Sequence, residues 1–101
     1  MGRNYRRTSN FIGEVSTSRY ILISTNPATQ IFLGTGNTAM HLFNNGSANL
    51  MWGDSSIGIN SSGVIFPLAA RNWQNMEDGW FTYVLAESAA TNITITEYRG
   101  V

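Results

Sequence analysis

An aspartate followed by two serines, Asp54, Ser55 and Ser56, gives the chain residue types that a hydrolase could use. A serine becomes a nucleophile when a base takes its proton and a third group orients that base. The only histidine, His41, is the one base available. The segment also lacks the second glycine of the G-x-S-x-G turn that exposes many catalytic serines. Because aspartate and serine commonly form turn hydrogen bonds, we expect a turn here and no catalytic residues.

Residues 34–39, Gly-Thr-Gly-Asn-Thr-Ala, match the glycine fingerprint of dinucleotide-binding proteins. That fingerprint works only where its last small residue begins a helix whose N-terminus faces the pyrophosphate. Here an Asn-Asn-Gly turn follows after only residues 40–43, so no helix fits. The sequence therefore predicts a hairpin loop rich in glycine and asparagine, and no nucleotide cofactor.

Acidic residues are too few and too scattered to suggest acid–base or metal chemistry. Glycosidases need two carboxyl groups with different environments, but Glu77 and Asp78 are adjacent and precede Gly79, which favours a charged hairpin turn. A metal site needs several histidine, cysteine or carboxylate ligands that converge. With one histidine, six acids and no cysteine in the chain, we expect no metal, no cofactor and no disulfide.

Three tryptophans, Trp52, Trp73 and Trp80, suggest a different kind of site. Exposed aromatic rings can form a platform on which sugars or unpaired nucleic-acid bases stack. In a chain without cysteine, aromatic residues more often build the core or a contact between subunits. We favour that second interpretation and treat the three tryptophans as interface aromatics.

Charge is low and unevenly distributed along the chain. Charged residues make up 12% of the sequence, against about 25% in typical soluble domains. Three of the six arginines lie in the first nine residues, so residues 10–101 carry three arginines and six acids, a net charge of −3. We expect residues 1–9 to be a flexible basic arm that binds an acidic protein surface, since three cations are too few to bind nucleic acid. The residues of the arm that would make this contact are Arg3, Tyr5, Arg6 and Arg7.

Membrane association and conventional secretion are not expected. No apolar run approaches the roughly 18 residues that a membrane-spanning helix needs. The polar start of the sequence also lacks the apolar centre of a signal peptide.

The pattern of residues 10–101 is that of one β-domain. Short segments rich in β-branched and aromatic residues alternate with Gly, Asn, Ser and Thr clusters at a spacing of about 8 to 12 residues. The sequence predicts an all-β antiparallel sandwich of about eight strands, either jelly-roll-like or immunoglobulin-like. The candidate strands are 11–15, 18–24, 29–34, 39–44, 48–53, 63–68, 71–76, 80–86 and 91–99.

Local signals assign some of these segments to partners and faces. Asn45-Gly46 lies between alternating runs and is a strong hairpin signal, so 39–44 is expected to pair with 48–53. In segment 91–99, Ile93 and Ile95 alternate with threonines, which predicts a strand with one buried and one solvent-exposed face. The set expected to share one face across the hairpin is Met40, Leu42, Ala48, Leu50 and Trp52, with His41, Phe43 and Met51 on the other.

Residues 20–23 and 80–85 are apolar at consecutive positions. In an antiparallel sheet this pattern means that the outer face is also covered, by another part of the protein or by a partner. We expect a neighbouring subunit to cover this face, so the chain should form a homo-oligomer, with a trimer as one form.

Residues 42–55, LFNNGSANLMWGDS, with 63–68, GVIFPL, and 94–98, TITEY, resemble small virion proteins of tailed bacteriophages. This group of capsid decoration, head-fibre and related accessory domains shares a hairpin with N-x-G near its tip, a w-G-s-v strand end, a G-x-x-L segment and a closing v-x-v-x-E strand. The likeness covers about residues 29–99. It carries over no functional residues, because the group has no catalytic set.

The resemblance implies a structural protein on the capsid surface of a virion. Such a decoration or cement protein would bind the major capsid protein where shell subunits meet. The alternative is a tail-fibre or host-recognition domain whose tryptophans stack on carbohydrate. In both cases we expect no enzyme activity.

Overall fold

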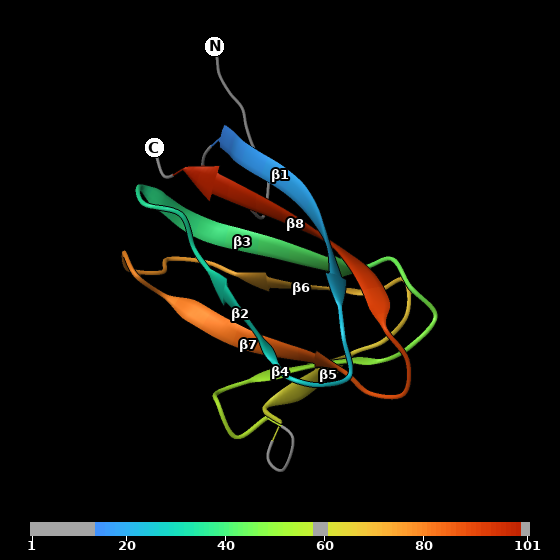
Figure 1. Cartoon of the computed structure of the whole chain (residues 1–101). Coiled ribbons are helices and arrows are strands. Elements are labelled where there is room, and N and C mark those ends of the chain that lie inside the picture. Colours follow the sequence, from blue (N-terminus) through green and yellow to red (C-terminus); the bar gives the residue numbers. More distant parts are fainter. Residues whose placement is uncertain (1–13, 58–60, 100–101) are drawn as a thin grey trace.

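The computed structural model describes residues 14–57 and 61–99. Residues 1–9, predicted as a basic arm, lie outside these ranges. The described residues contain strands and no helix, as the sequence predicts (Figure 1). The strands are β1 (Glu14–Ile23), β2 (Thr29–Phe32), β3 (Asn37–Asn44), β4 (Leu50–Gly53), β5 (Gly63–Ile65), β6 (Ala70–Trp73), β7 (Phe81–Ala86) and β8 (Thr91–Arg99).

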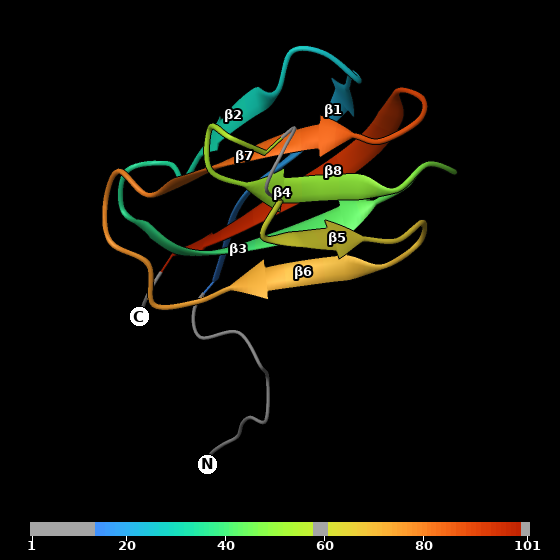
Figure 2. The same ribbon diagram turned by 90° about the horizontal axis from the view of Figure 1, so that it is seen from below.

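Two antiparallel sheets of four strands each lie face to face (Figure 2). Their strand orders are β1-β8-β3-β6 and β2-β7-β4-β5. The first strand therefore pairs with the last, the second with the seventh, the third with the sixth and the fourth with the fifth. Because successive pairs fall in opposite sheets, the chain is in effect one long hairpin rolled up from its tip. This strand order is that of a jelly roll, one of the two sandwich types expected.

The core lies between the sheets and is filled by alternate residues of each strand. In β8, Ile93 and Ile95 are completely buried while Thr94 and Thr96 are only partly covered, which confirms the predicted period of two. Burial of one such side chain contributes about 1.5–3 kcal/mol. The buried apolar cluster consists of Ile23, Ile31, Leu33, Met40, Leu42, Leu50, Ile65, Trp73, Val84, Ala86, Ile93 and Ile95.

The Asn45-Gly46 turn does not form the predicted hairpin. It connects β3 of one sheet to β4 of the other, and β3 pairs instead with β6 and β8. A two-residue hairpin of the type that Asn-Gly favours needs positive φ at both positions, and neither residue has one. Glycine is required at position 46 for space, since a Cβ there would lie 1.8 Å from the Thr91 hydroxyl oxygen. Met40, Leu42 and Leu50 are all buried, but they face the core from opposite sheets.

Two more predicted hairpins are turns between the sheets. The β2–β3 and β6–β7 connections each join one sheet to the other. The turns themselves are present: the Asn37 amide donates to the Gly34 carbonyl at 3.0 Å, and the Trp80 amide donates to the Glu77 carbonyl at 3.2 Å. Because β3 begins at Asn37, no helix follows the glycines of residues 34–39, and the dinucleotide fold is absent there.

Candidate strands 11–15 and 18–24 both overlap one strand, β1, which includes residues 14–15 of the first and 18–23 of the second. The register against β8 shifts between Val15 and Thr17, which marks a β-bulge. The sequence break between the two candidates is therefore an irregularity within a strand. Among the strands of the described residues, β1 lies at an edge of its sheet with β8 as its neighbour.

Asn44, at the end of β3, holds the two sheets together through a buried side chain. Its amide nitrogen donates to the carbonyls of Ala48 at 2.8 Å and Ile65 at 3.0 Å. Its amide oxygen accepts from the Gly46 amide at 3.0 Å and from the Thr91 hydroxyl at 2.8 Å. All four hydrogen-bonding positions of the side chain are therefore used.

A second buried polar centre lies at the other end of β8. The Glu97 carboxylate accepts hydrogen bonds from the Gly34 amide at 2.6 Å and the Asn37 side chain at 2.8 Å. It also forms an ion pair with Arg19 of β1. Burial acts to raise the pKa of Glu97, but the hydrogen bonds from Arg19, Gly34 and Asn37 outweigh burial and hold the pKa below its usual range.

Candidate partner-binding surfaces

The Asp-Ser-Ser cluster forms a turn, as expected. In the β4–β5 connection the Ser56 amide and hydroxyl both donate to the Asp54 carboxylate, at 2.9 and 2.6 Å. The Ile57 amide donates to the Asp54 carbonyl at 3.1 Å. The two bonds from Ser56, that of its hydroxyl first, lower the pKa of the exposed Asp54. The Asp54 carboxylate therefore accepts its hydrogen bonds from Ser56 of the same loop.

His41 is not brought to this cluster. It lies on the outer side of β3, opposite Thr96 of β8 and Asn72 of β6, and its Nδ1 hydrogen-bonds the Asn72 side chain. Asp54 follows β4 in the other sheet, so the core separates the two residues. Within residues 14–57 and 61–99, no group of three or more histidines and carboxylates is arranged to hold a metal.

The three tryptophans do come together, in one row across the side of the sandwich. Trp73 of β6 is buried, and its ring centroid lies 5.5 Å from that of Trp52 and 5.3 Å from that of Trp80. The Arg71 guanidinium carbon lies 4.1 Å from the Trp52 ring centroid, in cation–π geometry. Trp52 and Trp80 are partly buried against the core. The row joins β6 to β4, and the Trp52 ring is not a free platform.

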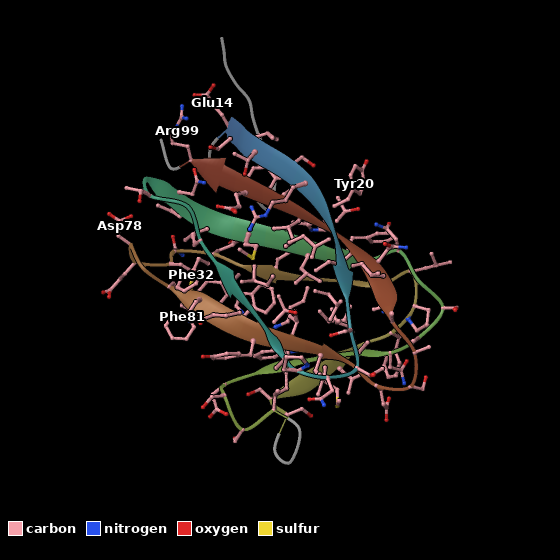
Figure 3. All side chains as sticks on the ribbon, viewed as in Figure 1. Glu14, Tyr20, Phe32, Asp78, Phe81 and Arg99 are labelled. Atoms are coloured by element: carbon pink, nitrogen blue, oxygen red, sulfur yellow. The ribbon has the colours of Figure 1, made fainter. Side chains whose placement is uncertain are left out.

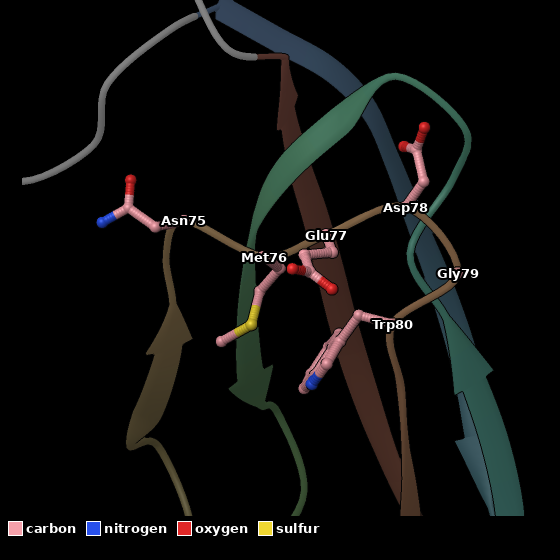
Figure 4. Close-up of a pocket in the computed structure, with 6 residues that line it drawn as sticks. All are labelled: Asn75, Met76, Glu77, Asp78, Gly79 and Trp80. Carbon is pink, nitrogen blue, oxygen red and sulfur yellow. The ribbon is translucent and has the colours of Figure 1, made fainter.

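A shallow pocket lies beside Trp80 in the β6–β7 connection. It has a volume of about 460 Å³ and is lined by residues 75–80. In Figure 4 the side chains of Met76, Glu77 and Trp80 lie on one side of the loop, and Asp78 points away from them. The Asp78 carboxylate accepts a hydrogen bond from the Gly36 amide at 3.3 Å, which ties this loop to the β2–β3 turn.

The outer side of the β2-β7-β4-β5 sheet is a continuous apolar surface, here called the apolar face. It follows the strand register: Phe32 lies opposite Phe81, and Met51 lies between Leu85 and Val64. Phe32 is 54% exposed and Phe81 is 44% exposed, with ring centroids 5.6 Å apart (Figure 3). The face consists of Phe32, Met51, Val64, Phe81, Tyr83 and Leu85.

A second apolar surface lies on β1, at the edge of the other sheet. Val15, Tyr20 and Leu22 are 60%, 80% and 63% exposed. Tyr20 projects from β1 away from Phe32 and Phe81 (Figure 3). We call these three residues the β1 surface. The consecutive apolar residues noted at 20–23 and 80–85 thus expose apolar side chains on both outer faces of the sandwich. Tyr20 and Leu22 of β1 lie on one face, and Phe81 of β7 lies on the other.

The tip of the β5–β6 connection is also exposed and apolar. The Ala69 amide donates to the Phe66 carbonyl at 3.0 Å, which closes a turn with Pro67 and Leu68 at its centre. Leu68 has a φ of 62°, and its side chain is 73% exposed. Glycine or asparagine usually occupies such a position, so a leucine here costs conformational energy.

The residues proposed for the arm, Arg3, Tyr5, Arg6 and Arg7, lie outside the described ranges. Sequence reasoning found the apolar character of 80–85 but missed Phe32, Met51 and Val64, which only the register places beside it.

No helix in the described part of the chain is long and apolar enough to cross a bilayer. No protein-family model, curated protein or solved structure matches the chain.

Proposed function

We propose that this chain is a virion structural protein, a decoration or cement protein that binds and stabilises a shell of the major capsid protein. The observation that carries the proposal is the β1 surface. Three large apolar side chains project from β1, a strand at the edge of its sheet that begins at Glu14, a few residues after the proposed basic arm. Edge strands with exposed apolar side chains are ready docking elements for another chain.

The described residues also suit a role without chemistry. The residue types that could catalyse a reaction bond to neighbouring side chains: Asp54 to Ser56 in its own turn, and His41 to Asn72 of the adjacent strand. The jelly roll occurs in viral capsid proteins and in lectins, and that fold-level analogy is compatible with the proposal without establishing it. A protein that binds only the assembled shell stabilises it by its own binding free energy.

Capsid binding should depend on the β1 surface and on the arm. We expect Leu22→Arg combined with Tyr20→Arg to reduce occupancy on capsids at least about tenfold, since two charges would replace apolar contacts. Deletion of residues 1–9 should reduce it as well. Occupancy is measured by mixing the purified protein with undecorated capsids, pelleting the particles and counting copies per particle by mass spectrometry.

The control for this experiment is Phe66→Arg, which places the same charge at a residue 62% exposed in the β5–β6 connection. It should leave occupancy unchanged. A wild-type protein that does not pellet with capsids, or a β1 double variant that binds as well as wild type, contradicts the proposal.

A second candidate, carbohydrate recognition on a tail fibre, is favoured by the pocket beside Trp80. Its volume of about 460 Å³ is within the range of small-ligand sites. It combines one indole ring with polar groups from Asn75 and Glu77, which is the mixture that sugars require.

Trp80→Ala should abolish any change in tryptophan fluorescence on titration with host-surface glycans, while Trp80→Phe retains part of the affinity because a ring remains. If glycans alter the fluorescence of wild-type protein and Trp80→Ala removes the response, the chain is a recognition domain. Full capsid occupancy by Trp80→Ala, with no glycan response in the wild type, excludes this candidate.

A further inference from the structure

The apolar face is uncharged at every outward position of its four strands, among the residues that the structure describes. Gln30 and Gly53 are the remaining outward residues, and Ser62 lies over Gly53, so the polar side-chain groups there are one amide and the Ser62 and Tyr83 hydroxyls. The aromatic rings of Phe32, Phe81 and Tyr83 contact one another in a ladder, with centroids 5.6 and 5.9 Å apart. Ring contacts of this kind hold the side chains in place before any partner arrives.

A surface of this kind selects an uncharged partner. A charged residue placed against it would lose its water and gain no ion pair, which is costly. The exposed acids Glu14 and Glu77 lie on other elements. Glu87 follows β7 directly and lies at the end of the face, where its carboxylate accepts a hydrogen bond from the Asn49 side chain, so a contact centred on the phenylalanines leaves it at the rim. A second copy of the apolar face itself meets these requirements.

The exposed area also suits a self-contact. Each aromatic side chain has roughly 150–250 Å² of surface, and the two phenylalanines are about half exposed. With the partly exposed Val64, Tyr83, Leu85 and Met51, the face offers on the order of 500 Å² per copy. Two copies would bury on the order of 1,000 Å², which is the lower bound for a specific interface.

We infer that two copies of the chain associate through the apolar face in a two-fold dimer. A surface that meets itself generates a two-fold axis and a closed pair, whereas a trimer needs two different complementary surfaces. The proposed assembly is therefore a dimer, whereas the sequence suggested a homo-oligomer with a trimer as one form. The β1 surface lies on the other sheet and stays exposed in this dimer, with one copy on each far side of the pair.

The dimer is tested on the full chain by sedimentation equilibrium over about a hundredfold range of concentration. Wild-type protein should have twice the chain mass of 11.1 kDa. Phe81→Arg should raise the dissociation constant of the dimer at least about 100-fold, because a charge enters the centre of the contact. Phe32→Arg should do the same. Since both side chains are about half exposed, the circular dichroism spectrum of each variant should match wild type.

Leu22→Arg is the matched control, because it places the same charge on the opposite outer face at a residue 63% exposed. It should remain dimeric. A wild-type monomer at all concentrations, a wild-type trimer, or dissociation by Leu22→Arg but not by Phe81→Arg overturns the inference. A monomer would mean that the face is covered by the chain's own terminal residues or by another partner. Capsid occupancy is a separate measurement, so the dimer and the capsid role can fail independently.

Discussion

Replacement of Asn44 by aspartate is expected to lower the free energy of unfolding by about 4 kcal/mol. The two residues have nearly the same shape, so the change is in hydrogen bonding alone. The amide nitrogen that donates to the Ala48 and Ile65 carbonyls becomes an oxygen that faces both of them. The side chain must then either stay protonated or bury a charge beside two carbonyl oxygens, and both options are unfavourable.

Urea unfolding followed by tryptophan fluorescence measures this loss. The total stability of a domain of this size is about 5–15 kcal/mol, so the variant should unfold at a much lower midpoint. Asn45→Asp is the control, because it makes the same substitution one position along at an exposed residue. It should cost no more than about 1 kcal/mol. Equal losses at the two positions would contradict the role given to Asn44.

Glu97→Gln is expected to lower the free energy of unfolding by about 3 kcal/mol at pH 7. The charge-assisted bonds from Arg19, the Gly34 amide and Asn37 would weaken together, because the acceptor is no longer ionised. One end of the new amide would also present N–H groups to the Arg19 guanidinium, which is itself a donor.

The pH dependence of this loss has a definite sign. Because the pKa of Glu97 is lowered in the folded state, its ionised form contributes stability above about pH 4.3, the ordinary value for glutamate. That contribution is lost as the pH falls through the lower, folded-state pKa. The stability difference between wild type and Glu97→Gln should therefore be constant from pH 7 to about pH 5 and shrink below about pH 4.3.

Glu87→Gln is the matched control for the Glu97 series. Glu87 is exposed, and its carboxylate accepts one hydrogen bond, from the Asn49 side chain at 3.0 Å. The variant should differ from wild type by about 0.5 kcal/mol or less. A Glu97→Gln curve parallel to wild type at all pH values would show that the buried carboxylate does not act as described.

The strands were predictable because their signal is local. Each described strand except β1, which spans two candidates, falls largely within one candidate segment, and the alternation of Ile93 and Ile95 with threonines correctly gave the inner side of β8. The same alternation places Glu97 on the inner side, two residues after Ile95. A charged residue at an inward position is a signal for a buried polar centre that could have been used.

Pairing between strands was not predictable from turns, because in this fold most connections cross between sheets. Asn45-Gly46 has the composition of a hairpin, yet its glycine is needed because Thr91, distant in sequence, packs against it. The one hairpin among neighbouring strands, β4–β5, contains the Asp-Ser-Ser cluster that first suggested a nucleophile. The residue types of the turns could not distinguish the β4–β5 hairpin from the connections that cross between the sheets.

The candidate surfaces were only partly visible in the sequence. The consecutive apolar residues of β1 and β7 predicted apolar outer faces, and Tyr20, Leu22 and Phe81 are exposed in the single chain. That a neighbouring subunit covers them stays a prediction. The extension of the apolar face to Phe32, Met51 and Val64 depends on strand order, which brings residues from four separate segments together. The assembly of Trp52, Trp73 and Trp80 into one row depends on it too.

The pairing of the first strand with the last has a consequence for how the protein is made. Arg19 and its partner Glu97 are 78 residues apart, so at ribosomal rates of about 5–20 residues per second the first strand waits roughly 4–16 seconds for its neighbour. During that wait the β1-β8-β3-β6 sheet cannot be completed, and the nascent chain exposes Ile21 and Ile23, which the folded protein packs into its core. Synthesis of this protein is therefore its most aggregation-prone stage, and its yield should depend on chaperones that bind apolar nascent segments.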